Sequence, residues 1–205
     1  MQYPWLEISR ELQSIAQAGL TFTENKYDID RYHQLMKLSQ RIIADFTDIK
    51  LEKVEKVFNM EEGYLTPKVD VRGVVIREGK VLLVKETIDD CWSMPGGWAD
   101  VGYTPKEIAV KEVFEESGLV VAAGRLLAVL DKKCHNHPPD INYVYKIFIH
   151  CNEVEGEPTP GMETSEVGFF GLDKLPPLST PRNTEEQIRM VFEKIVNNDC
   201  SAEID

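Results

Sequence analysis

The sequence contains no long hydrophobic run, and its N-terminus lacks a charged segment followed by an apolar one. A helix needs roughly 20 mostly apolar residues to cross a membrane, and a secretory signal needs a basic start before an apolar core. Internal repeats and low-complexity tracts are also lacking. We therefore expect a protein that neither enters a membrane nor is secreted.

Cysteine is scarce and scattered. The four thiols, Cys91, Cys134, Cys151 and Cys200, show no C-x-x-C spacing. Paired spacings are typical of disulfide frameworks and of closed zinc sites, so neither is indicated. Reduced thiols in the cytoplasm are the simplest interpretation.

Positive charge is in deficit. Lys and Arg together number 23 against 35 Asp and Glu, which gives a net charge of −12. Because nonspecific affinity for a duplex depends on cationic contacts to phosphate, stable DNA binding is not expected. An anionic substrate is still compatible with this balance, since bound metal ions can reverse the local field.

The composition is that of an ordinary globular protein, with 42% hydrophobic and 28% charged residues in 205 positions. This length allows one large or two small domains. Residues 1–62 show helical periodicity, and residues 67–205 alternate strand and helix patterns, with a linker at Glu61–Pro67. The predicted fold class is α/β (α+β), with a mixed sheet between helices preceded by a small all-helical domain.

The helical part predicts three helices. One begins near Trp5 and stops at Gly19, and the others cover about Asp28–Phe46 and Leu51–Asn59. So small a segment has too little mass for a strong core, so we expect it to pack on the other domain or on another subunit. The later strands are predicted at Val71–Ile76, Val81–Val84, Leu119–Asp131, Ile141–Cys151 and Glu166–Phe170. Thr184 begins a final helix, and a frayed tail is predicted at Asn197–Asp205.

A capped helix follows a glycine turn at Gly97. Thr104 is a good N-cap, Pro105 suits the first helical position, and Glu107 completes a capping box. Gly118 is placed to end the helix in the left-handed conformation. The apolar side of the helix, which we expect to dock on a sheet, consists of Ala109, Val110, Val113 and Phe114.

The same helix carries Glu112, Glu115 and Glu116, which share one face at positions i, i+3 and i+4. Like charges this close repel unless a cation lies among them. Oxygen ligands suit hard cations such as Mg²⁺ or Mn²⁺, and Mg²⁺ often bridges carboxylates to substrate phosphates. A solvated acidic face is the alternative, but the preceding glycine turn favours a metal-assisted phosphate enzyme.

This stretch resembles the Nudix box, G-x5-E-x7-R-E-U-x-E-E-x-G-U, in which U is aliphatic. Gly97 fills its first position, and the second half is in register from Glu112 through Gly118 to Leu119. Two positions differ, because Tyr103 replaces the first Glu and Lys111 replaces the Arg. Lys111 can still lie beside Glu115, although it lacks the bidentate fork of an arginine.

The resemblance implies metal-dependent hydrolysis of a nucleoside diphosphate linked to another moiety. Mg²⁺ or Mn²⁺ would be held by the three glutamates and the Gly97 carbonyl, and would make a water molecule more acidic for in-line attack at phosphorus. The family often takes its base from a later loop. Here that loop is Gly161–Glu166, with Glu163 as the first choice and Glu166 as the second.

The helical leader resembles a Nudix subgroup that acts on X-linked nucleoside diphosphates, through Leu12–Leu20 and Tyr27–Tyr32. Within it, the chain looks most like the enzymes that split CDP-choline into CMP and phosphocholine. The alternatives are ADP-ribose or a sugar nucleotide, an RNA end, and a non-catalytic nucleotide sensor. We expect the leader to form a homodimer, cover the pocket, or do both.

Further substrate contacts are predicted outside the box. Lys133, His135 and His137 could contact phosphate or base, and Arg72 could contact phosphate. A zinc site at Cys134, His135 and His137 lacks a second ligand pair. A choline head would need aromatic faces, for which Trp98 is the first choice among Trp5, Trp98, Tyr103 and Tyr145.

Overall fold

A computed structural model describes residues 3–58 and 63–205 of the chain, which form two compact units. The helical unit holds the described residues up to Pro67 together with the short segment Pro139–Tyr143. The α/β unit holds Lys68–Pro138 and Val144–Asp205. No described helix has the length and apolar character needed to cross a membrane. Glu61 and Glu62 of the predicted linker, and Asn59 of the third predicted helix, lie outside the described residues.

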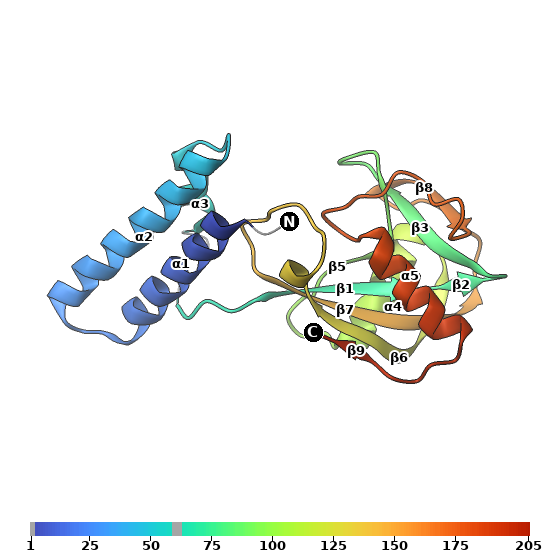
Figure 1. The fold of residues 1–205 in the computed structure, drawn as a ribbon. Coiled ribbons are helices and arrows are strands. Elements are labelled where there is room, and N and C mark those ends of the chain that lie inside the picture. The colour runs from blue at the N-terminus through green and yellow to red at the C-terminus, as the bar shows by residue number, and fades with distance from the viewer. Residues whose placement is uncertain (1–2, 59–62) are drawn as a thin grey trace. The chain divides into compact units, whose positions relative to one another are not determined.

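The helical unit consists of α1 (Pro4–Phe22), α2 (Lys26–Phe46) and α3 (Leu51–Phe58). The first two run side by side as an antiparallel pair, drawn in blue in Figure 1. The predicted stop at Gly19 is wrong, because α1 continues to Phe22. A Cβ atom on Gly19 would lie 2.2 Å from the Tyr32 ring, so glycine serves close helix packing here and does not end the helix.

Small and polar side chains fill much of the α1–α2 contact. Ser9 and Ser39 are fully buried and hydrogen-bond reciprocally, each hydroxyl donating to the other residue's carbonyl at 2.9 and 2.8 Å. The apolar core of this unit is small and consists of Leu6, Ile43, Val54 and Phe58. The inserted segment is held by Arg10, which donates to the carbonyls of Asp140 and Asn142 at 2.6 and 2.9 Å.

The α/β unit places α4 (Pro105–Ser117) and α5 (Glu185–Val196) around two sheets. One sheet has the order β5-β1-β7-β6-β9, in which β1 and β7 are parallel. In the other, β3 lies between β2 and β4 and also pairs with β8. The strands are β1 (Lys68–Val74), β2 (Ile76–Arg77), β3 (Lys80–Glu86), β4 (Trp92–Ser93), β5 (Gly96–Trp98), β6 (Val120–Asp131), β7 (Val144–Glu155), β8 (Thr164–Phe170) and β9 (Glu203–Ile204).

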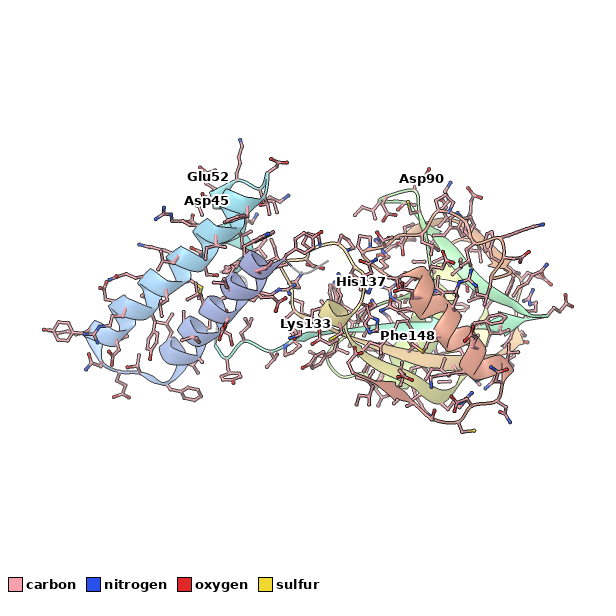
Figure 2. The ribbon with its side chains drawn as sticks, in the orientation of Figure 1. Asp45, Glu52, Asp90, Lys133, His137 and Phe148 are labelled. Carbon is pink, nitrogen blue, oxygen red and sulfur yellow. The ribbon has the colours of Figure 1, made fainter. Side chains whose placement is uncertain are left out.

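Each helix covers its own hydrophobic cluster. Ile108, Ala109 and Val113 of α4 pack with Val71 and neighbouring strand residues. Ile188 and Val191 of α5 pack on the opposite cluster, which includes Phe148, labelled in Figure 2. The predicted docking of Phe114 is wrong, since this side chain is exposed while Ala109 and Val113 are fully buried. With 3.6 residues per turn, Phe114 is rotated away from the face that its neighbour Val113 buries.

The C-terminal segment is ordered, so the predicted frayed tail is wrong. Strand β9 pairs in parallel with β6, at Ala128–Glu203 and Val129–Ile204 (Figure 1). A side-chain oxygen of Asp205 accepts the Asp131 amide hydrogen at 2.8 Å, and Arg125 donates to the Lys194 carbonyl at 2.8 Å. These contacts link sequence-distant residues, which local composition does not reveal.

Candidate active site

Helix α4 presents the three box carboxylates, and both of its ends are capped as predicted. Thr104 and Glu107 form the capping box, and Gly118 ends the helix at a φ of 70°. Glu116 is buried at 6% exposure, whereas the side chain of Glu115 is 55% exposed. The face therefore runs from the protein interior to solvent within a single turn.

The predicted glycine turn at Gly97 is wrong, because Gly96 and Gly97 lie in strand β5, which pairs with β1 and brings its backbone against these carboxylates. The Gly96 amide donates to Glu116 Oε2 at 3.0 Å. A Cβ on Gly97 would lie 3.1 Å from Glu112 Oε2, so the backbone passes close to that carboxylate. Gly96 has a φ of 148°, and a Cβ there would meet the Val71 carbonyl at 2.1 Å. Glycine is thus required for this strand to lie between β1 and α4.

Burial disfavours the charged form of Glu112 and Glu116 in the absence of a cation. It raises the pKa of Glu116 to about 8, and it also raises the pKa of Glu112. Carboxylate and carbonyl oxygens form the donor set that Mg²⁺ and Mn²⁺ prefer, so the residues fit such an ion. Within residues 3–58 and 63–205, no three His, Cys, Asp or Glu side chains already stand together as a finished metal site.

Lys111 replaces the box arginine and contacts three carboxylates. Its Nζ lies 3.2 Å from Asp100, 3.2 Å from Glu112 and 3.4 Å from Glu115. The contacts to Asp100 and Glu112 raise the pKa of Lys111, so it stays cationic. The predicted approach to Glu115 is confirmed, while Tyr103, at the other changed position, is exposed.

Arg72 lies on β1, and each nitrogen of its guanidinium donates a hydrogen bond within the protein. It donates to the two carboxylate oxygens of Asp70 at 3.2 and 2.8 Å and to the Met94 carbonyl at 3.1 Å. Its charge reaches Glu116 and lowers that pKa against the larger effect of burial. Lys146 of β7 also binds Asp70, and burial lowers the pKa of Lys146 to about 8. The structure therefore shows a buried ion-pair cluster beside the box.

The later loop reaches the end of α4. Thr164 Oγ1 donates to the Glu116 carbonyl at 2.8 Å, and a Cβ on Gly161 would lie 1.7 Å from the Glu115 carbonyl oxygen. Glu163 is exposed, and its carbonyl accepts from the Thr87 amide at 3.0 Å. Glu166, the second choice for the base, pairs with Lys85 at 3.0 Å. The loop thus holds Glu163 near the box while Glu166 is engaged elsewhere.

Sequence patterns missed a buried carboxylate on β3. Glu86 is 4% exposed, accepts from Ser93 Oγ at 2.6 Å and pairs with Arg182 Nε at 2.9 Å. Its charge also contributes to the raised pKa of Glu116. Charged residues inside otherwise apolar strands, here Asp70, Glu86 and Lys146, were the available signal.

The segment after β6 separates the three predicted substrate contacts. Its short helix η1 (Lys132–Cys134) carries the exposed Lys133, which lies 4.0 Å from Asp131 (Figure 2). His135 Nε2 lies 3.0 Å from Asp205, whereas His137 is buried with Nδ1 2.7 Å from the Thr180 carbonyl. The two histidines are thus engaged with different partners, which disfavours the zinc alternative.

The candidate aromatic residues do not form a cage in the described structure. Trp98, Tyr103 and Tyr145 are exposed, and Trp5 stacks on Phe46 within the helical unit at 5.6 Å. Trp98 lies on β5 directly after Gly96 and Gly97, opposite Asp70.

Two family descriptions match the chain. Residues 3–58 match the family described as UDP-X-like, N-terminal oligomerisation domain, and residues 66–191 match the NUDIX domain. A Bacillus subtilis protein provisionally named ADP-ribose pyrophosphatase YjhB is 47% identical over 193 residues, covering 94% of this chain and 93% of the relative. An ADP-ribose pyrophosphatase of Methanocaldococcus jannaschii is 33% identical, covering 57% of this chain and 69% of the relative.

Two solved structures are similar as well. A Streptococcus suis structure titled as an ADP-ribose pyrophosphatase has 45% identity and a TM-score of 0.63, covering 68% of this chain and all of that one (100%). A structure titled UDP-X diphosphatase has 31% identity and a TM-score of 0.64, covering 98% of both chains. Together with the box carboxylates on a capped helix, these matches show that the chain belongs to the Nudix family and is a pyrophosphohydrolase.

Proposed function

We propose that this enzyme hydrolyses the diphosphate bridge of ADP-ribose or a closely related nucleoside diphosphate derivative. The observation that carries the proposal is the intact carboxylate face of α4 against Gly96 and Gly97 of β5. The adenosine assignment rests on relatives that carry ADP-ribose pyrophosphatase names. The CDP-choline expectation finds no comparable support, and the ADP-ribose alternative fits better.

Glu112, Glu115, Glu116 and the Gly97 carbonyl are the residues that would hold divalent cations, Mg²⁺ or Mn²⁺. Such ions supply charge neutralisation at the diphosphate and lower the pKa of bound water. The role of these residues is to hold their carboxylate and carbonyl oxygens where a cation can bridge them to the diphosphate of the substrate. Lys111 supports this by keeping a positive charge among Asp100, Glu112 and Glu115.

Glu163 is the proposed general base. It lies on the loop anchored to the end of α4 through Thr164, and its side chain is exposed to solvent. Lys133, His135, His137 and Trp98 are proposed substrate contacts, with Arg72 as a nearby charge that is already paired to Asp70.

A substrate panel tests the proposal. ADP-ribose, CDP-choline, UDP-glucose and a capped RNA end are compared with Mg²⁺ or Mn²⁺, and the products are separated by chromatography. We expect AMP and ribose 5-phosphate from ADP-ribose at the highest kcat/KM. Preferred cleavage of CDP-choline or the RNA end would overturn the substrate assignment, and failure to cleave any of the four would favour the sensor.

We further propose that the helical unit joins two copies of the chain. Its α1 and α2 helices expose large apolar side chains, namely Ile8, Ile15, Phe22, Leu38 and Phe46. Ile8, Ile15 and Phe22 recur at heptad spacing and so lie along one face of α1. The matched family is described as an oligomerisation domain, which agrees with this use. Measuring the mass of the full chain in solution tests it, since a monomer at micromolar concentration would contradict the homodimer.

A cytoplasmic location is the remaining proposal. None of the four cysteines forms a disulfide, as expected in a reducing compartment. Cell fractionation with an antibody against the chain would test it, and recovery outside the soluble cytoplasmic fraction would contradict it.

A further inference from the structure

Three buried polar atoms of the α/β unit have no hydrogen-bond partner, and they belong to two residues of the segment 180–187 and to a histidine that contacts this segment at Thr180. They are His137 Nε2, Asn183 Nδ2 and Gln187 Nε2. The three residues are 9%, 0% and 1% exposed. Leaving a buried polar group without a partner costs about 1–3 kcal/mol, so three in one region are unusual for a finished interior.

The donor and acceptor roles of these atoms are fixed by their other contacts. His137 Nδ1 lies 2.7 Å from the Thr180 carbonyl, which can only accept, so Nδ1 carries the hydrogen. Burial lowers the pKa of His137 to about 4, so its ring is neutral and Nε2 is an acceptor. The nearby charges of Lys132, Lys146 and His135 act in the same direction.

The side-chain amides of Asn183 and Gln187 each leave a donor without a partner. Asn183 Oδ1 accepts from the Met94 amide at 2.7 Å, and Gln187 Oε1 accepts from the Thr184 amide at 3.1 Å. A backbone amide can only donate, so both side-chain nitrogens are the free ends and are donors. The region therefore offers one acceptor and two donors.

The three residues are tied to one short segment near the active site. The ring of His137 donates to the Thr180 carbonyl, and the backbone N–H of Asn183 donates to the Ser179 carbonyl at 3.1 Å. Met94, which binds Asn183, also accepts from Arg72 beside the box. Figure 2 places His137 on the side of the unit where α5 begins.

We propose that His137, Asn183 and Gln187 read the base of the nucleotide substrate and select an amino base over a keto base. This inference rests on the proposed function. The exocyclic amine of adenine or cytosine would donate to His137 Nε2, and the adjacent ring nitrogen would accept from an amide. A phosphate offers only acceptor oxygens in its ionised form and cannot satisfy His137 Nε2.

Hypoxanthine and uracil reverse the pattern at the same edge. Their carbonyl would face the His137 acceptor, and their ring N–H would face an amide donor. Sites built from buried polar groups reject ligands that leave those groups unpaired. Because the three atoms are closed off in this structure, base binding requires the loop carrying His137 to shift, as induced fit allows.

The test compares ADP-ribose with its hypoxanthine analogue. We expect the wild-type protein to favour the adenine substrate by about 10-fold or more in kcat/KM, the order expected for two reversed hydrogen bonds. His137→Asn can keep a donor toward Thr180 while removing the acceptor at the position of Nε2, because the asparagine side chain is too short to reach it. Gln187→Glu keeps the capping box while deleting the donor. Each variant should reduce the preference to within about 3-fold.

His150→Asn is the matched control, because it makes the same change at a partly buried histidine of β7 and should keep the wild-type preference. A wild-type protein without base preference, or an unchanged preference in His137→Asn and Gln187→Glu, would overturn the inference. If both variants kept the preference for adenine, the three buried atoms would be assigned to hydrogen bonds with ordered water.

Calorimetry with AMP and IMP, without metal, separates this inference from the proposed function. If no diphosphate is cleaved but AMP binds more tightly than IMP in a His137-dependent manner, the base site stands and the proposed reaction fails. If ADP-ribose is cleaved and AMP and IMP bind equally, the reaction stands and the base site fails.

Discussion

The two units distribute their hydrophobic side chains in opposite ways. The α/β unit buries large aliphatic and aromatic residues in two clusters, including Leu127 and Phe148 in one and Leu82 in the other. In the helical unit, the buried positions of α1 include Ser9, Gln13 and Gln17, while Ile8, Ile15 and Phe22 are exposed. Exposed apolar patches often mark interaction sites, so this difference supports the proposed self-association through the helical unit.

The largest expected effect is a cavity in the α/β core. Phe148→Ala should lower the free energy of unfolding by about 3–5 kcal/mol, because it removes a fully buried ring beneath α5. Phe22→Ala, at an exposed position of α1, is the comparison and should change it by less than about 0.5 kcal/mol under dilute conditions. Urea denaturation measures both. Equal losses would show that the two units do not differ in this way.

The second effect is confined to the active site. Glu116→Gln should reduce kcat at least about 100-fold, since it removes charge from the carboxylate face. Glu155→Gln, at an exposed position of β7, is the control. Steady-state kinetics and solution mass are measured together. Unchanged turnover in Glu116→Gln would show that the box carboxylates do not catalyse, and a changed mass would link the site to assembly.

The third effect depends on pH. The folded pKa of His137 is about 4, below the unfolded value of about 6.5, so the unfolded chain takes up the proton first as pH falls. This contribution to stability is fully present above pH 6.5 and is lost progressively toward pH 4. Between pH 7 and 4.5, the wild-type protein should lose about 2 kcal/mol more than His137→Asn.

Denaturation at several pH values measures this difference, with the exposed His33→Asn on α2 as the control. Parallel pH profiles for the wild type and His137→Asn would show that the ring is not held neutral. Such a result would also remove the assigned acceptor at Nε2.

The smallest effect concerns association. Ile15→Glu places a charge in the exposed apolar stripe of α1 and should weaken self-association at least about 10-fold, since a charge would have to be desolvated at the interface. Ser14→Glu adds the same charge at the neighbouring exposed position and should have less effect. Sedimentation equilibrium compares the two variants. Equal weakening would point to net charge, and no weakening would place the interface elsewhere.

Local sequence predicted the elements whose determinants are local. Thr104, Glu107 and Gly118 cap α4 because each acts through backbone groups within a few residues. Thr184 and Gln187 begin α5 for the same reason. Gly19 misled the prediction because a glycine that ends a helix and one that admits a neighbouring ring look alike in sequence.

By itself, the sequence determined the helices, the longer strands and the acidic face of α4, because periodicity and capping are short-range properties, whereas the short strands β4, β5 and β9 depend on pairing with distant residues. Only the tertiary structure decided that Glu86 lies near Glu116, that Asp70 joins Arg72 to Lys146, and that the tail pairs with β6. It also decided which nitrogen of His137 is free. These outcomes depend on burial and on contacts between distant residues, and both are set by how the layers pack.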